Sequence, residues 1–237
     1  HGAGFGSGLA FGGLRPGYAV YSTFCQRAYD QVIHDVCIQE NSVIFCLDRA
    51  GLPGEDGWTH HGVFDIAFMR CVPRMALMAP RDAEELELML QLAIDQTTTP
   101  VTIRYPKATV PEFPSIIRQE LRLGKAERMV EGEGVVLFAY GSMVENAWNA
   151  LSELSKNGIN ATLVNARFAK PLDVEMLKSL AKDHHTLVTL EEHTLMGGFG
   201  SAVAEAVADA NLGFSKVLRF GIPDEFITFG PRAKLLE

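Results

Sequence analysis

Short apolar runs alternate with stretches of helical pattern along most of the chain, and this alternation restricts the folds open to it. We predict strands at 18–21, 43–47, 75–79, 101–105, 134–140, 161–165, 186–190 and 217–220. We predict helices at 23–39, with Ser22 or Thr23 as the N-cap, from 82 onward, and at 144–156, 173–182 and 201–211. Strands that alternate with helices build mainly parallel sheets with helices on both faces, so the predicted fold class is α/β.

The alternation weakens over residues 107–134, where several prolines and glycines fall. We predict a linker here, because these residues are typical of loops. The length of 237 residues accommodates two domains of ordinary size. The prediction is therefore two successive domains, 1–118 and 119–237, each with a mainly parallel sheet flanked by helices.

Composition and charge describe an acidic globular protein. An apolar share of 47% is enough to form a sizeable core. The formal net charge of −8, without any run of Lys and Arg, argues against a nucleic-acid partner. The cysteines form no Cys-x-x-Cys pair, and three lie in apolar segments, so we expect free, reduced thiols in a cytoplasmic protein. They are Cys25, Cys37, Cys46 and Cys71.

Gly4, Gly8 and Gly12 recur every four residues near the start of the chain. On a helix they form a smooth face for close backbone approach, so we expect a tightly packed core helix here. Residues 2–14 are too few to span a bilayer and lack a basic leading region, so we expect neither a membrane span nor a signal peptide. The chain opens at His1 without a methionine, and we expect that residues preceding it are missing.

The glycine-rich run at 48–62, directly after the apolar residues 43–47, concentrates ionisable side chains. Loops at the carboxyl ends of parallel strands commonly carry the chemistry of a protein, so we predict an active-site loop. His60 suits acid–base work or hydrogen bonding to a substrate, because imidazole titrates near neutral pH. A metal site at His60 and His61 is disfavoured, because neighbouring side chains point apart and no Cys/His cluster lies nearby.

Arg49 and Arg104 each end a predicted strand. Arginines in this position commonly bind phosphate or carboxylate through paired hydrogen bonds, and the alternative for either one is a structural salt bridge. The pattern leaves both readings open.

A second polar group, Glu191-Glu192-His193, follows the strand at 186–190 and precedes a glycine turn. The two carboxylates suit acid–base chemistry, and a role at a sheet edge or interface explains them equally well. The turn Gly197-Gly198-Phe199-Gly200 has the wrong spacing for a dinucleotide-binding fingerprint, so we predict a helix entry. His184 and His185 are expected at the surface.

Several motifs together resemble one enzyme family, the 1-deoxy-D-xylulose-5-phosphate synthases of the transketolase-like, thiamine-diphosphate-dependent group. They are the runs 21–31 (YSTFCQRAYDQ), 48–51 (DRAG), 56–62 (DGWTHHG), 104–106 (RYP), 167–173 (RFAKPLD) and 196–201 (MGGFGS). The β subunits of 2-oxo-acid dehydrogenases share the glycine turn and lack the first two runs. The resemblance therefore favours the synthases.

The resemblance implies a partial pyrimidine-binding domain followed by a transketolase C-terminal-like domain. The family's diphosphate and Mg²⁺ motif has no counterpart in this sequence. Neither has the glutamate that hydrogen-bonds the pyrimidine, which lies two residues before the position of His1. We therefore expect this stretch alone to be inactive and to contain no metal site.

The resemblance also implies a reaction and partners. Pyruvate is joined to D-glyceraldehyde 3-phosphate with loss of CO₂, giving 1-deoxy-D-xylulose 5-phosphate. This product opens the non-mevalonate route to isoprenoids and feeds thiamine and pyridoxal synthesis. The cofactors are thiamine diphosphate and Mg²⁺, and the family forms homodimers.

Seven residues match positions to which the family assigns a role. Phe24 packs against the pyrimidine ring of the cofactor. His60 and Asp56 are catalytic: His60 contacts the pyruvate-derived adduct and assists proton transfer, and Asp56 helps to hold acceptor and intermediate. The substrate-binding residues are Tyr21, Arg27, Arg49 and Arg104, of which the last two bind the acceptor phosphate.

Two positions depart from the family pattern. Lys107-Ala108-Thr109 stands where the family usually has an arginine or lysine followed by Gly-Asn or similar, so the charge is kept and the resemblance does not predict the loop geometry. Cys25 replaces a residue that is commonly aliphatic. The alternatives are another thiamine-diphosphate carboligase, a 2-oxo-acid dehydrogenase β subunit, or a non-catalytic dimerisation module.

Overall fold

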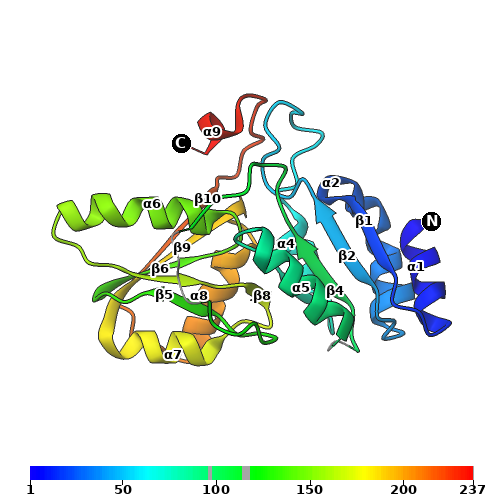
Figure 1. Ribbon diagram of the computed structural model, residues 1–237, viewed down its shortest axis with the longest axis horizontal. Coiled ribbons are helices and arrows are strands. Elements are labelled where there is room, and N and C mark those ends of the chain that lie inside the picture. Colours follow the sequence, from blue (N-terminus) through cyan, green and yellow to red (C-terminus); the bar gives the residue numbers. More distant parts are fainter. Residues whose placement is uncertain (96–97, 114–117, 237) are drawn as a thin grey trace.

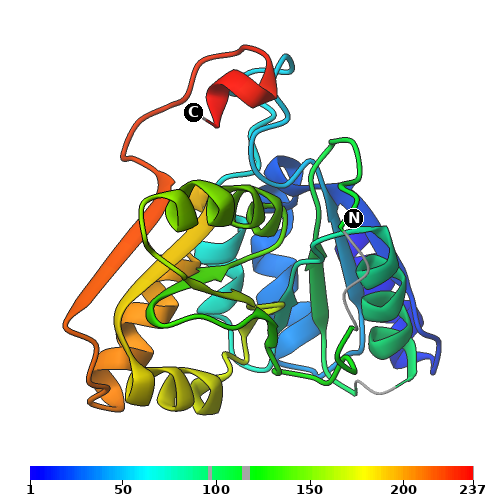
Figure 2. The same cartoon turned by 60° about the vertical axis from the view of Figure 1, so that its left-hand side comes forward.

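Two five-stranded sheets with helices packed on them make up the chain (Figure 1). The structure is a computed structural model that describes residues 1–95, 98–113 and 118–236. The sheets lie side by side, and a long loop from the first half stands next to the C-terminal helix at one end of the molecule (Figures 1 and 2). The predicted α/β class with mainly parallel sheets is confirmed.

The first sheet has the order β1-β2-β4-β3-β8. Its first four strands are parallel, and β8, which comes from the second half of the chain, pairs antiparallel with β3. The strands are β1 (Gly17–Tyr21), β2 (Ile44–Asp48), β3 (Ala76–Met78), β4 (Val101–Arg104) and β8 (Phe168–Lys170). The second half thus adds an edge strand to the sheet of the first half.

The helical segment after β1 is not one regular α-helix. It begins at Ser22 and changes its hydrogen-bonding pattern three times through α2 (Ser22–Cys25), η1 (Gln26–Ala28), α3 (Tyr29–Gln31) and the π-helical η2 (Val32–Cys37). The predicted N-cap is wrong, because Tyr21 holds that position and makes no side-chain cap bond. The other helices of this half are α1 (Gly2–Phe11), α4 (Asp65–Arg70) and α5 (Ala83–Asp95).

The second sheet has the order β10-β9-β6-β7-β5, with only β5 antiparallel to its neighbour. Its strands are β5 (Glu127–Val130), β6 (Gly134–Ala139), β7 (Thr162–Asn165), β9 (His184–Thr194) and β10 (Lys216–Ile222). The helices of this half are α6 (Met143–Lys156), α7 (Val174–Asp183), α8 (Phe199–Asp209) and α9 (Arg232–Leu235). Predicted elements therefore recur here with shifted ends, and β5, β8 and α9 are additional.

The alternating direction of the side chains along β6 explains why helices cover both faces of the sheet in the second half. Val136 and Phe138 join the core that α7 and α8 cover, and this core continues into the first half. Leu137 and Ala139 face the opposite way, toward α6. Successive side chains of a strand point to opposite faces, so this strand supports both layers at once.

Three predictions from the sequence differ from the structure. The glycine stripe of α1 is not its packed face: Ala3, Gly6 and Ser7 are buried, whereas the helix leaves Phe5 and Phe11 exposed. His184 is buried rather than at the surface, because its ring bonds the Thr162 hydroxyl and the Leu180 carbonyl. The predicted linker contains β5, and its residues 114–117 lie outside the described part of the chain.

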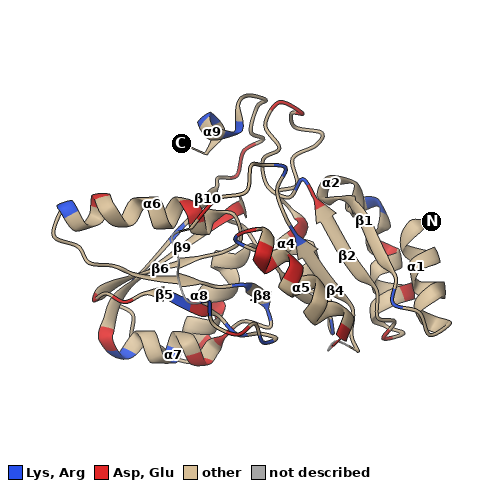
Figure 3. Cartoon of the chain, in the orientation of Figure 1, with Lys and Arg blue, Asp and Glu red and all other residues tan. Residues whose placement is uncertain are grey.

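The prediction of free thiols is confirmed, and the cytoplasmic location stays a prediction. All four thiols are free, with Cys25 and Cys37 buried and Cys71 exposed. No helix in the described ranges is long and apolar enough to cross a membrane. Basic and acidic residues are spread over both halves (Figure 3).

A buried charge network joins the two halves. Glu85 of α5 is fully buried, and its carboxylate accepts hydrogen bonds from Arg167 Nε at 2.8 Å and from Asn165 Nδ2 at 3.0 Å. Arg167 also lies 3.2 Å from Glu127, which pairs with Arg81 at 2.7 Å. Buried charges are tolerated only when each has partners, so these side chains fix how the halves meet.

Replacement of Arg167 by Met should strongly destabilise the chain, because Glu85 and Glu127 would lose a buried cationic partner. Breaking a buried pair from one side costs about 3–5 kcal/mol. Denaturant unfolding followed by circular dichroism measures this. The control Lys178→Ala removes an exposed pair with Glu175 and should leave the midpoint unchanged. Equal midpoints for the Met variant and the unsubstituted chain would contradict the role of the network.

Candidate active site

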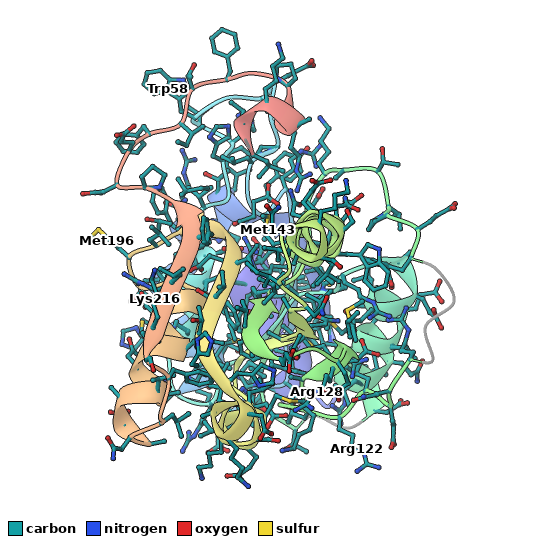
Figure 4. The ribbon with its side chains drawn as sticks, turned by 90° about the vertical axis from the view of Figure 1, so that its left-hand side faces the viewer. Trp58, Arg122, Arg128, Met143, Met196 and Lys216 are labelled. Atoms are coloured by element: carbon teal, nitrogen blue, oxygen red, sulfur yellow. The ribbon has the colours of Figure 1, made fainter. Side chains whose placement is uncertain are left out.

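The loop after β2 leaves the sheet at Asp48 and returns at Gly62. Its neck is closed by two hydrogen bonds of 2.8 Å, in which Gly51 and Gly62 each donate to the carbonyl of the other. Ala50 donates to Tyr105 O, which ties the neck to the segment after β4. Trp58 stands at the tip, where Figure 4 shows it at the outer end of the molecule. The loop is therefore a long projection on a rigid base.

Four predicted site residues come together beside this loop. The rings of Tyr21 and Phe24 stack at 5.3 Å between centroids, and His60 lies edge-on to Phe24 at 5.4 Å. The Arg49 guanidinium covers the Tyr21 ring at 3.8 Å. Phe24 is 42% exposed, so it offers solvent a flat apolar ring next to an imidazole. This arrangement suits a planar heterocycle.

A carboxylate lies between two cations on the same side of the loop. Asp56 is 3.7 Å from Arg49 Nε and 3.3 Å from Lys107 Nζ. Arg49 also pairs with Asp48 and has a φ of 55°. A residue other than glycine is uncommon in this left-handed region, and such strain is frequent at functional sites. The two cations thus converge on the Asp56 carboxylate.

Arg104 lies apart from this cluster. Its side chain is 3% exposed, and its Nε donates to both Asp65 oxygens at 3.0–3.1 Å. Its Nη2 donates to the carbonyls of Gly62 and Glu192. The structure thus uses Arg104 to hold the base of the loop, and its predicted contact with a substrate phosphate stays a prediction.

Arg27 and His61 also differ from the central cluster. Arg27 is exposed on η1, one turn beyond Phe24. His61 is 4% exposed, and burial lowers the pKa of its imidazole. His60 and His61 therefore have separate surroundings, as expected for adjacent residues. Lys107 is a cation of this cluster that was not among the predicted site residues. The sequence signal for it was the basic residue that follows Arg104-Tyr105-Pro106, where the family pattern also has a basic residue.

Behind the loop lies a buried polar layer from the end of β9. Glu191 accepts hydrogen bonds from the backbone amides of Phe199 and Gly200, so it caps α8, whose start confirms the predicted helix entry. Burial raises the pKa of Glu191 to about 7. His193 accepts from the Ala67 amide through Nε2, and its Nδ1 lies 2.8 Å from Thr194 O. These partners fit a neutral ring with its proton on Nδ1.

Metal ligation has no support in the described ranges, where no group of three or more His, Cys, Asp or Glu residues is placed to hold an ion. The site therefore offers an aromatic face, an imidazole and a pair of cations. These groups have the chemistry to contact a flat ring and a phosphate or carboxylate group.

Two family models match the chain. Residues 1–112 match the transketolase pyrimidine-binding domain, and residues 124–237 match the transketolase C-terminal domain. The predicted domain boundary at 118/119 falls between the matched ranges and stays a prediction.

Curated relatives agree with this match. The chain is 51% identical over 229 residues to a 1-deoxy-D-xylulose-5-phosphate synthase of Synechococcus sp. (strain JA-2-3B'a(2-13)), which covers 96% of this chain and 35% of that protein. It is 50% identical over 236 residues to the synthase of Thermomicrobium roseum, with 99% and 37% covered. The chain thus spans about a third of the length of these relatives.

Solved structures share the fold. A split-gene transketolase, described as an inactive β4 tetramer, is similar with a TM-score of 0.85 and 32% identity over 94% of this chain and 72% of that one. A transketolase of Campylobacter jejuni subsp. jejuni has a TM-score of 0.74 at 18% identity, with 93% of this chain and 33% of that one covered.

The pH dependence of stability should include a contribution from His193. Burial lowers its pKa to about 4, below the ordinary 6.5, so the folded state binds fewer protons than the unfolded state between these values. The stabilisation is complete above pH 6.5 and is lost as the pH falls toward 4.

His193→Gln should remove this part of the slope. The measurement is the free energy of unfolding of both chains at several pH values. The difference between the two free energies of unfolding separates the contribution of His193 from that of Glu191. The raised pKa of Glu191 acts in the opposite sense, because it costs stability as the pH rises toward 7. A difference that does not vary with pH would contradict the prediction.

Proposed function

The chain belongs to the transketolase family and is homologous to the C-terminal portion of 1-deoxy-D-xylulose-5-phosphate synthases, and from this membership we propose that it carries the acceptor-binding side of such a synthase. The proposed reaction joins pyruvate to D-glyceraldehyde 3-phosphate with loss of CO₂. The observation that carries the proposal is the convergence of Arg49 and Lys107 on Asp56, with Arg49 also covering the Tyr21 ring that stacks on Phe24.

The exposed ring of Phe24 fits the pyrimidine of thiamine diphosphate, because a flat apolar face stacks on a flat heterocycle. When bound, this cofactor supplies the electron sink for loss of CO₂ and carbon–carbon bond formation. Mg²⁺ belongs with the diphosphate, for which the described residues offer no ligand cluster. The described residues therefore fit the pyrimidine end of the cofactor.

The remaining residues bind and orient the substrates. Arg49 and Lys107 hold the acceptor phosphate, and Tyr21 keeps the Arg49 guanidinium in place through its ring. Asp56, which lies between these two cations, helps to hold the acceptor and the intermediate. His60, at the edge of the Phe24 ring, transfers a proton to and from the oxygen on the reacting carbon of the substrate. Arg27, on η1, supports the binding of the acceptor.

Arg104 is proposed to act differently from the sequence prediction. Its guanidinium is buried against Asp65 and two carbonyls, so a phosphate would have to displace internal partners. We therefore assign the second phosphate contact to Lys107 and give Arg104 the task of holding the loop neck.

A longer polypeptide or a second subunit is proposed to complete the site, because the relatives extend over nearly three times this length. The split-gene transketolase, described as an inactive β4 tetramer, is an assembly of comparable chains. We propose that the chain alone is inactive, works within a homodimer and resides in the reducing cytoplasm, where its four thiols stay free. Analytical ultracentrifugation and cell fractionation test the last two points.

The full-length gene product should release CO₂ from pyruvate with thiamine diphosphate and Mg²⁺, and glyceraldehyde 3-phosphate should stimulate the release. A coupled CO₂ assay and mass spectrometry of the ketose phosphate measure this. Release that does not respond to the aldehyde would point to a different thiamine enzyme. The chain of residues 1–237, assayed alongside, should be inactive.

Phosphate binding by Arg49 and Lys107 predicts a selective kinetic defect. Arg49→Ala and Lys107→Ala should each raise KM for glyceraldehyde 3-phosphate by about tenfold or more, since a charged hydrogen bond contributes about 1.5–3 kcal/mol. KM for pyruvate should not change. Steady-state assays of the full-length protein measure both constants.

Two further variants separate the roles. His60→Ala should lower kcat with cofactor affinity unchanged, and Arg104→Ala should lower the free energy of unfolding. If Arg104→Ala alone raised the acceptor KM, and Lys107→Ala did not, the assignment of the phosphate contact to Lys107 would be wrong.

A further inference from the structure

One buried carboxylate connects the loop at 49–62 to three separate parts of the second half. Glu192, near the end of β9, is 2% exposed. Its Oε1 accepts from the Leu52 amide at 2.8 Å, and its Oε2 accepts from the Ser142 hydroxyl, just before α6, at 2.6 Å. Arg232 of α9 donates to both oxygens, at 3.2 and 2.5 Å. The carboxylate is thus fully engaged, with the loop as one of its partners.

The loop backbone is shaped to receive this carboxylate. Gly51 has a φ of +82°, and a Cβ at this position would lie 2.4 Å from the Glu192 side chain. A left-handed glycine at such a contact allows the backbone to approach where any side chain would collide. The contact between Glu192 and the loop is therefore built into the chain conformation.

The C-terminal segment closes over the other side of the loop. A Cβ on Gly54 would meet Gly230 O at 3.0 Å and Arg232 N at 3.1 Å, so the two backbones touch. Leu52 and Val63 are buried with Ile222 in a small apolar cluster, against which Ile227, Leu235 and Leu236 pack. Figure 2 shows the C-terminal segment (red) beside this loop (cyan). The loop is held between β9 and α9.

The side chains of the proposed site stand on this same loop. Arg49, Asp56 and His60 belong to it, and the interactions described for them involve neither Glu192 nor Arg232. In the described part of the chain, the ion pair contacts this loop at its backbone, where it restricts the positions of Leu52 and Gly54. Active-site geometry must be held to within a fraction of an ångström, so release of this anchor affects binding.

We propose that Glu192 and Arg232 are positioning residues, which clamp the active-site loop of the first half from the second half. The kinetic consequence rests on the function proposed above. The clamp itself does not, because it is a property of the loop that can be measured without turnover.

Hydrogen exchange of the full-length protein, read by mass spectrometry on peptides from 49–62, tests the clamp directly. Glu192→Gln and Arg232→Met should each speed exchange in this loop by about tenfold, the effect of losing one charged hydrogen bond. Exchange in β6 and β7 should stay unchanged. The control Lys234→Ala alters an exposed cation on the same helix and should leave the loop unchanged.

A second measurement uses the loop tryptophan. In the chain of residues 1–237 with Trp148→Phe, Trp58 is the sole tryptophan and is 61% exposed at the loop tip. Its fluorescence anisotropy should fall in the Arg232→Met variant, and Arg232→Lys should restore part of it. In steady-state assays, Arg232→Met should raise the acceptor KM several-fold and leave the pyruvate KM unchanged, which a general loss of stability would not do.

The outcomes separate the two proposals. Faster loop exchange in a protein without synthase activity supports the clamp and refutes the proposed function. Unchanged loop exchange in both Glu192→Gln and Arg232→Met overturns the clamp, whatever the activity. Exchange that rises equally across β6, β7 and the loop also overturns it, because the pair would then support the whole second half.

Discussion

The burial of Glu85 together with Arg167 sets how the two halves of this chain meet, and the candidate site depends on that arrangement. Both side chains are fully buried, and each has several partners from the opposite half or from the segment that joins them. A buried ion pair adds little net stability compared with apolar packing, but it tolerates few alternative geometries. Its contribution here is to select one orientation of the halves, which β8 reinforces by joining the first sheet.

This orientation brings the loop at 49–62 against the end of β9. The first half supplies the side chains that are suited to binding or catalysis. They are Tyr21, Phe24, Arg49 and His60, at the carboxyl ends of β1 and β2. The second half supplies the buried groups that hold the loop, with Glu192 foremost among them. A site divided in this way depends on the interface between the halves as much as on its own residues.

The sequence predicted much of this because the relevant patterns are local. Buried parallel strands give apolar runs, so β2, β4 and β6 were recognisable, whereas the role expected for Phe24 came from the family resemblance. Elements that depend on distant partners were missed. β8 has three residues and pairs with a strand some ninety positions earlier, while β5 lies in a stretch interpreted as a linker. The same limit explains His184, whose burial depends on Thr162 in a neighbouring strand.

By itself the sequence determined the α/β class, the order of most strands and helices, and the loop on which the candidate residues stand, because hydrophobic periodicity and glycine content act over a few neighbouring positions. Only the tertiary structure revealed the different surroundings of Arg49 and Arg104, which look alike as arginines at strand ends. Arg49 reaches the exposed cluster, whereas Arg104 is buried against Asp65 and carbonyls from two segments. Burial and charge pairing depend on which distant segments meet, and no local pattern records this.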